Sequence, residues 1–113
     1  MIYNYTPMPK YLTIKKSDID GLGVFASEDI PVKKYLIIGP THMIIYNDLY
    51  RLDFGGFINH SESPTCHLIE YDTINDIKLF SILIDRPIMK GEELTLNYMD
   101  SFKILKMDME INF

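Results

Sequence analysis

The sequence Gly-Glu-Glu-Leu-Thr-Leu-Asn-Tyr occupies residues 91–98 and predicts a turn that leads into a strand. The glycine suits the turn, and the strand is expected from Leu94 to Leu96. The adjacent carboxylates of Glu92 and Glu93 suggest a hydrolase, but neighbouring residues on a strand point to opposite faces. Two such carboxylates cannot flank one glycosidic bond, so the sequence argues against a glycosidase site here.

On both sides of this strand, short β-rich segments alternate with turn signals. These segments are 11–15, 24–25, 35–38, 42–46, 66–72 and 78–84. Turns are indicated by Gly21 and Gly23, by Pro31 and by Pro87. Residues 48–54 have apolar side chains at a helical spacing, but the segment is short for a stable helix. Strands that recur about every 8–12 residues predict a mainly β domain.

The size and charge of the chain narrow the classes of function. With 113 residues, the chain is expected to form a single domain over residues 1–113, with an irregular N-terminal arm over residues 1–10. The net charge is −5, from 11 basic and 16 acidic residues. An acidic protein repels phosphate backbones, so nucleic-acid binding is disfavoured. A basic protein or peptide is the more natural partner.

Cys66 is the only cysteine, which excludes an intrachain disulfide and indicates a reducing compartment. We expect it to be a small buried residue. His60, Cys66 and His67 match no structural zinc spacing, so no metal is predicted. The sequence contains neither a signal peptide nor an apolar run of the roughly 20 residues that a membrane span needs. An intracellular protein without a membrane segment is expected.

Two further motifs carry chemistry. Gly21-Leu22-Gly23 is a strand turn in its simplest interpretation, and it lacks the third glycine of a dinucleotide fingerprint. Its bare backbone would also let a nucleoside cofactor lie against the main chain. In the second motif, Asn59 and His60 follow an apolar pair. The Asn59 amide either caps a local turn or binds an adenine edge or the amino-acid end of a cofactor.

These three motifs, in this order between about residues 12 and 102, resemble the SET-domain protein lysine methyltransferases. The resemblance implies a SET-domain (β-clip-like) fold of several short sheets with a knot-like C-terminal crossing. It implies an enzyme that transfers a methyl group from S-adenosyl-L-methionine to the ε-amine of a lysine in a protein. The product would be S-adenosyl-L-homocysteine.

The resemblance also implies roles for individual residues. Tyr98 would lie at the methyl-transfer centre and act in catalysis. The cofactor would be bound by Asp20, Gly21, Leu22, Gly23, Asn59, His60, Tyr98 and Phe102. Aromatic side chains would line an apolar channel that helps the lysine lose its proton. Besides Tyr98, the candidates for this channel are Tyr46, Tyr50 and Tyr71.

The chain departs from the family pattern in three respects. Thr65 follows Pro64 where relatives have Asn, the insert before Asn59 is short, and a cysteine-rich zinc tail is missing. These departures leave open a catalytically inactive SET-like domain that binds a basic peptide or a partner protein. A small all-β assembly protein without a cofactor is a third hypothesis, which requires the motifs to be coincidental.

A SET domain without flanking domains is most similar to the virus-encoded members of the family. That similarity implies a homodimer, and the cytoplasm or nucleus of a host cell as the location. Residues 104–113 alternate apolar and polar side chains. We therefore expect residues 103–113 to form either a lid over the cofactor site or a dimer contact.

Overall fold

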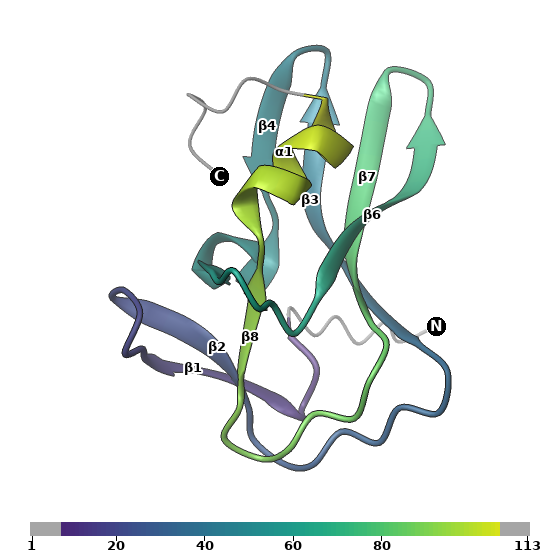
Figure 1. The fold of residues 1–113 in the computed structure, drawn as a ribbon. Coiled ribbons are helices and arrows are strands. Elements are labelled where there is room, and N and C mark those ends of the chain that lie inside the picture. Colours follow the sequence, from purple (N-terminus) through teal and green to yellow (C-terminus); the bar gives the residue numbers. More distant parts are fainter. Residues whose placement is uncertain (1–7, 107–113) are drawn as a thin grey trace, which may run out of the picture.

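The computed structural model describes residues 8–106, in which eight strands, one 3-10 helix and one α-helix form two sheets with a helix above them (Figure 1). The prediction of a mainly β domain is confirmed. Residues 1–7 and 107–113 lie outside the described part, and with them most of the predicted N-terminal arm and of the predicted lid. None of the helices within residues 8–106 is long and apolar enough to cross a membrane.

The first sheet has the order β1-β2-β8-β5. Its strands are β1 (Leu12–Lys16), β2 (Leu22–Ala26), β8 (Glu93–Leu96) and β5 (Asn59–His60). The hairpin of β1 and β2 contains the glycine turn, and β2 pairs antiparallel with β8. The short β5 pairs parallel with β8, with Asn59 opposite Thr95 and His60 opposite Leu96. Three segments that are distant in the sequence therefore meet along β8.

The second sheet is antiparallel and has the order β4-β3-β7-β6. Its strands are β4 (Asp48–Arg51), β3 (Leu36–Ile45), β7 (Ile77–Ile84) and β6 (His67–Ile74). The two strands expected at 35–38 and 42–46 are one strand, whose register shifts between Ile38 and His42. The helical spacing at 48–54 is also misleading, because that segment forms β4 and the start of the 3-10 helix η1 (Asp53–Phe57).

Buried apolar side chains of both sheets form one core cluster. β7 contributes Phe80, Ile82 and Ile84, and β8 contributes Leu94 and Leu96, all nearly inaccessible to solvent. Thr95, on the other face of β8, is buried as well. A strand that is buried on both faces belongs to the centre of a fold, so β8 lies at the centre of the molecule.

The loop 59–66 passes around the end of β8. The Ser61 N–H donates to the Leu96 carbonyl at 3.0 Å, and the Cys66 N–H donates to the Thr95 carbonyl at 3.0 Å. Successive carbonyls of a strand point to opposite edges, so one loop holds both edges of β8. Figure 1 shows this loop crossing β8 just below the helix. This is the knot-like crossing that the resemblance implies.

The helix α1 (Tyr98–Leu105) begins directly after β8 and was not expected from the sequence. Asn97 caps it, because its side-chain carbonyl accepts a hydrogen bond from the Asp100 N–H at 3.1 Å. The helix ends at Lys106, which has the left-handed conformation that often terminates helices. Consequently the first residues of the segment expected to form a lid or a dimer contact, from Lys103 to Leu105, belong to this helix.

Candidate functional site

The turn between β1 and β2 is shaped by its two glycines. The Ser17 N–H donates to the Gly21 carbonyl at 2.8 Å, and Gly21 has φ +40°, where side chains are rare. A Cβ built on Gly21 would meet no atom within 4 Å, so the outer side of the turn is open. A Cβ built on Gly23 would collide with Oε2 of Glu93. Gly21 therefore provides the turn, and Gly23 allows Glu93 to approach closely.

Asn59 connects this turn to the centre of the fold. Its amide nitrogen donates toward the Asp20 carbonyl at 3.1 Å, the Leu22 carbonyl at 3.2 Å and Oε2 of Glu93 at 2.8 Å. An amide group has only two hydrogens, so these three acceptors share them. The amide nitrogen thus faces a group of oxygen acceptors on the turn and on β8.

His60 is coupled to the first residue of α1. Its Nδ1 accepts a hydrogen bond from the Tyr98 N–H at 3.0 Å, and the two ring centroids are 5.2 Å apart. A ring nitrogen that accepts a hydrogen bond is unprotonated, so a neutral His60 carries its proton on Nε2. The imidazole therefore fixes both the backbone and the ring of Tyr98.

Tyr98 is half-buried, and its hydroxyl donates to the Ile58 carbonyl at 2.5 Å. Burial raises the pKa of this phenol, and the negative charges of Asp20 and Glu93 raise it further against the opposing effect of Arg51. The hydroxyl is therefore neutral at physiological pH. It is suited to hydrogen bonding and positioning, and not to acting as a charged base.

Seven of the eight predicted cofactor residues lie in this one region, which we call the turn cluster: Asp20, Gly21, Leu22, Gly23, Asn59, His60 and Tyr98. The eighth, Phe102, lies one turn further along α1 and is only 6% exposed. A ring that binds a cofactor must be accessible to it, so the role of Phe102 in cofactor binding stays a prediction.

The three tyrosines predicted for a lysine channel lie on the second sheet. Tyr46 forms the turn after β3, Tyr50 lies on β4 and Tyr71 lies on β6, with exposed fractions of 77%, 45% and 59%. Side chains as exposed as these do not form the wall of a closed channel. Their part in substrate binding stays a prediction.

Glu93 was not predicted as a site residue. Its carboxylate accepts hydrogen bonds from the Ser17 hydroxyl at 2.7 Å and from the Asn59 amide at 2.8 Å. Its neighbour Glu92 points away and pairs with Arg86 at 3.1 Å. Because neighbouring side chains on a strand point to opposite faces, the sequence predicts that only one of the two carboxylates faces the interior. The position of the glycine turn in the structure shows that this residue is Glu93.

Thr65, which replaces the Asn of the family pattern, faces β8. Its hydroxyl accepts a hydrogen bond from the Thr95 N–H at 2.9 Å and donates to the Glu93 carbonyl at 3.1 Å. Cys66 beside it is fully buried, as predicted, and burial raises the pKa of its thiol to about 11. Thr65 therefore holds the loop 59–66 against β8. Its replacement of the family's Asn affects the crossing and not the open side of the glycine turn.

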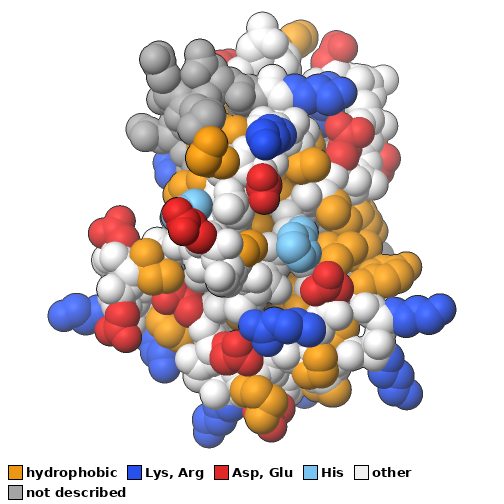
Figure 2. Space-filling view, viewed as in Figure 1, with side chains coloured by type: hydrophobic (Ala, Val, Ile, Leu, Met, Phe, Trp, Pro, Cys, Tyr) orange, Lys and Arg blue, Asp and Glu red, His pale blue; other side chains and the backbone are white. Residues whose placement is uncertain are grey.

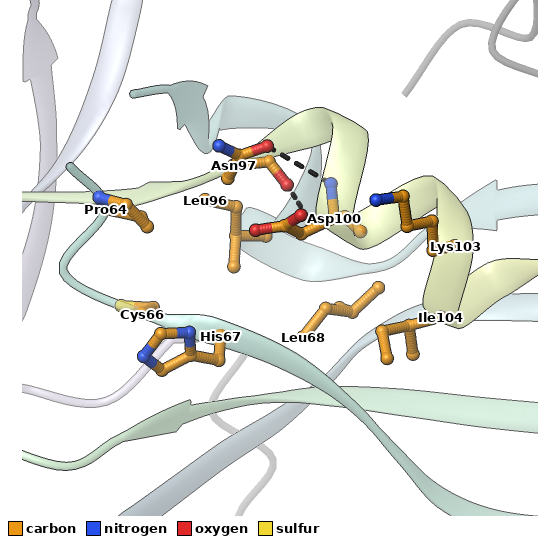
Figure 3. A pocket seen from close by; sticks show the side chains of 10 residues that line it. Pro64, Cys66, His67, Leu68, Leu96, Asn97, Asp100, Lys103 and Ile104 are labelled. Atoms are coloured by element: carbon orange, nitrogen blue, oxygen red, sulfur yellow. Dashed lines mark hydrogen bonds between the residues drawn. The ribbon is translucent and has the colours of Figure 1, made fainter. Parts of the chain in front are cut away.

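A cavity of about 320 Å³ lies between α1 and the start of β6. Leu68, Leu96 and Ile104 give it apolar walls, and Figure 3 shows Asp100 and Lys103 projecting from α1 on the opposite side from His67. None of the residues of the turn cluster lines this cavity. Within residues 8–106, no group of three His, Cys, Asp or Glu side chains is placed to hold a metal ion.

Comparison with known proteins shows similarity to one family model and to solved structures. A family model described as SET domain matches residues 40–99, which include Asn59, His60 and Tyr98. The chain is also similar to the crystal structure of a Plasmodium falciparum protein, whose name provisionally describes it as a histone methyltransferase. The two structures superimpose with a TM-score of 0.60. That protein is 28% identical in sequence, and the match covers 80% of this chain and 95% of that chain. A search of curated protein sequences finds no match.

Proposed function

Since the chain belongs to the SET domain family, we propose that it transfers a methyl group from S-adenosylmethionine to the ε-amine of a lysine in a protein. The family and the mainly β SET-type fold that the sequence predicts are confirmed. One observation carries the proposal further. The glycine turn, Asn59, His60 and Tyr98 meet in one place, although 77 positions separate Gly21 from Tyr98 in the sequence.

The donors and acceptors of the turn cluster fit the proposed cofactor. The turn is open outside Gly21, so a ligand can approach the backbone there. The carbonyls of Asp20 and Leu22 and the Glu93 carboxylate share the hydrogens of the Asn59 amide, and together these oxygen atoms favour a positive charge nearby, such as an ammonium or a sulfonium. When bound, S-adenosylmethionine supplies the methyl group on a positively charged sulfur.

Tyr98 is the residue to which we assign the catalytic role. Its neutral hydroxyl is held in place by the Ile58 carbonyl, and its ring is held against His60. The phenolic oxygen can accept weak C–H···O contacts from a polarised methyl group, each worth about 0.5–1 kcal/mol. Alignment of the reacting groups can contribute roughly 7–11 kcal/mol, so the main contribution of Tyr98 is its fixed position.

We propose a basic protein or peptide as the substrate. The net charge of −5 favours such a partner over nucleic acid. Figure 2 agrees with this, because the Lys and Arg side chains on the face that it shows are scattered and form no single patch. The cavity beside α1 is lined by Lys103 as well as Asp100 and by no residue of the turn cluster, so we do not assign the target lysine to it. The lysine must lose its proton before it attacks, and apolar surroundings favour that loss.

We further propose that the protein acts inside cells, in the host cytoplasm or nucleus if it is encoded by a virus. A single buried thiol is the observation that supports a reducing compartment. A homodimer is proposed because a domain of 113 residues has a small core, to which a second subunit would add. The oligomeric state is measurable by light scattering.

Calorimetric titration with S-adenosylmethionine and S-adenosylhomocysteine tests the proposed function. We expect saturable binding, and we expect Asn59→Ala to weaken it about 30-fold, because hydrogen bonds to charged groups contribute about 1.5–3 kcal/mol. Asn47→Ala is the matched control, because Asn47 is exposed between β3 and β4 and should leave binding unchanged.

The outcomes of this titration separate the hypotheses. If the wild-type protein binds neither compound, the proposed function is wrong. If it binds the cofactor but methylates no peptide in a library of lysine-containing sequences, the inactive peptide-binding domain is the better description. The contacts that Thr65 makes with β8 remove one of the reasons for that alternative.

A further inference from the structure

We propose that Glu93 is a positioning residue for the cofactor: it joins the glycine turn to Asn59 and gives this site a negative charge. The inference rests on the proposed function, and it concerns a residue that lies within the third motif but to which the resemblance assigns no role. Glu93 begins β8, the central strand that also leads to Tyr98. One residue on this strand can therefore align both the glycine turn and the start of α1.

The carboxylate of Glu93 accepts hydrogen bonds from two side chains. The Ser17 hydroxyl lies 2.7 Å from Oε1 and 3.0 Å from Oε2, and Oε2 also accepts from the Asn59 amide at 2.8 Å. Ser17 in turn accepts from the Ile19 N–H at 2.9 Å through its side-chain oxygen. The carboxylate thus holds a serine that organises the turn and the asparagine that faces it. Hydrogen bonds to an ionised acceptor are roughly twice as strong as neutral ones.

The surroundings of Glu93 hold it in this position. The absence of a side chain at Gly23 leaves room for the carboxylate, since a Cβ there would collide with Oε2. The backbone carbonyl of Glu93 accepts a hydrogen bond from the Thr65 hydroxyl at 3.1 Å, so the crossing also fixes this residue. The second glycine of the motif is therefore explained by the approach of Glu93, and not by the turn itself.

The negative charge of Glu93 acts on the site. It is one of the charges that raise the pKa of Tyr98, so its field reaches the phenol. A negative charge attracts a sulfonium and has little effect on a neutral thioether. The site should therefore bind S-adenosylmethionine more tightly, relative to S-adenosylhomocysteine, than it would without this carboxylate. Such a preference would favour release of the product.

The test is a titration of Glu93→Gln with both compounds. Glutamine has nearly the same shape, but it is neutral and cannot accept from Ser17 and Asn59 with both of its terminal atoms. We expect the Kd of S-adenosylhomocysteine to rise about tenfold, because one charge-assisted bond is lost. The Kd of S-adenosylmethionine should rise further, by about another fivefold, because the charge is lost as well.

Glu92→Gln is the matched control, because its carboxylate pairs with Arg86 and the Met89 N–H on the other side of the strand. It should leave both Kd values unchanged. If Glu93→Gln does not fold, Ser17→Ala keeps the carboxylate and removes one of its donors. We expect the Kd values of both compounds to rise about threefold in that variant, because one hydrogen bond is lost.

If Glu93→Gln folds and keeps the wild-type Kd values, the positioning role is wrong. If only Ser17→Ala folds, unchanged Kd values in that variant lead to the same conclusion. An equal loss for both compounds in Glu93→Gln would overturn the role of the charge. In these cases the wild-type protein still binds the cofactor, so the proposed function survives. If the wild-type protein binds neither compound, both the proposed function and this inference are wrong. A lower melting temperature with unchanged Kd values would show that Glu93 serves only the fold.

Discussion

Replacement of Tyr98 by Phe is expected to lower kcat at least about 100-fold, while S-adenosylmethionine binds within about threefold of the wild-type Kd. The hydroxyl is the only group removed. In the proposed reaction it provides a fixed oxygen acceptor beside the methyl group, and loss of one preorganised polar group at a reaction centre commonly costs this much. The effect should appear in kcat, because the contact matters most in the transition state.

The variant should keep its fold. The phenylalanine ring can still pack on His60, and the Tyr98 N–H that binds Nδ1 of His60 is a backbone group. The hydrogen bond to the Ile58 carbonyl is lost, at a cost of about 1 kcal/mol in the free energy of unfolding. A melting temperature near that of the wild type would therefore accompany the loss of activity.

The measurement is single-turnover transfer of a labelled methyl group at saturating cofactor, with calorimetry for the Kd. Tyr35→Phe is the matched control, because Tyr35 is exposed before β3 and far in sequence from every motif. It should transfer methyl groups at the wild-type rate. Turnover of Tyr98→Phe within a few-fold of wild type would contradict the catalytic assignment.

Much of the fold could be predicted because most of its strands follow from local patterns of apolar and turn-forming residues. The apolar residues of 78–84 and 94–96 and the glycines of the first turn predict β7, β8 and the hairpin. β3 was divided wrongly because Gly39 and Pro40 are turn signals, whereas in the structure they lie within a strand whose register shifts there. The helix α1 was missed, although Asn97 is a common N-cap residue.

The crossing could not follow from any local pattern. It depends on bonds between Thr65 and Thr95, which are 30 positions apart, and on the two edges of β8. No periodicity in the sequence encodes which loop passes around which strand. Only the resemblance to a family predicted it.

For the site, motif spacing predicted which segments meet, and the structure adds which atoms meet. The structure brings the segments of Asn59 and Tyr98 together through the hydrogen bond between His60 and the Tyr98 N–H, while Glu93 was set aside because adjacent carboxylates on a strand cannot act together. That argument is correct for the pair and says nothing about one of them acting alone. The channel tyrosines were chosen for residue type alone, and type does not determine which face of a strand a side chain occupies.

A second large effect is expected from His42, whose side chain is fully buried on β3. Burial, and secondarily the charge of Arg51 on the paired strand, lowers its pKa from 6.5 to about 4. Between these two values the unfolded chain binds a proton that the native protein does not, so stability falls as the pH falls. A tenfold change in a proton-binding constant corresponds to about 1.4 kcal/mol, so acidification from pH 7 to pH 4 should remove about 3 kcal/mol from the free energy of unfolding.

The check is urea unfolding of the wild-type protein and of His42→Leu at several pH values between 7 and 4. Leucine cannot titrate, so the difference between the two curves isolates His42 from the carboxylates that titrate in both proteins. We expect the wild type to lose about 3 kcal/mol more than the variant over this range, whatever their stabilities at pH 7. If the variant does not fold, NMR titration of the wild-type imidazole decides, because His42 should remain neutral until the pH approaches 4. Protonation of His42 near pH 6.5 in the folded protein, or equal slopes in the two unfolding series, would show that burial does not control this residue.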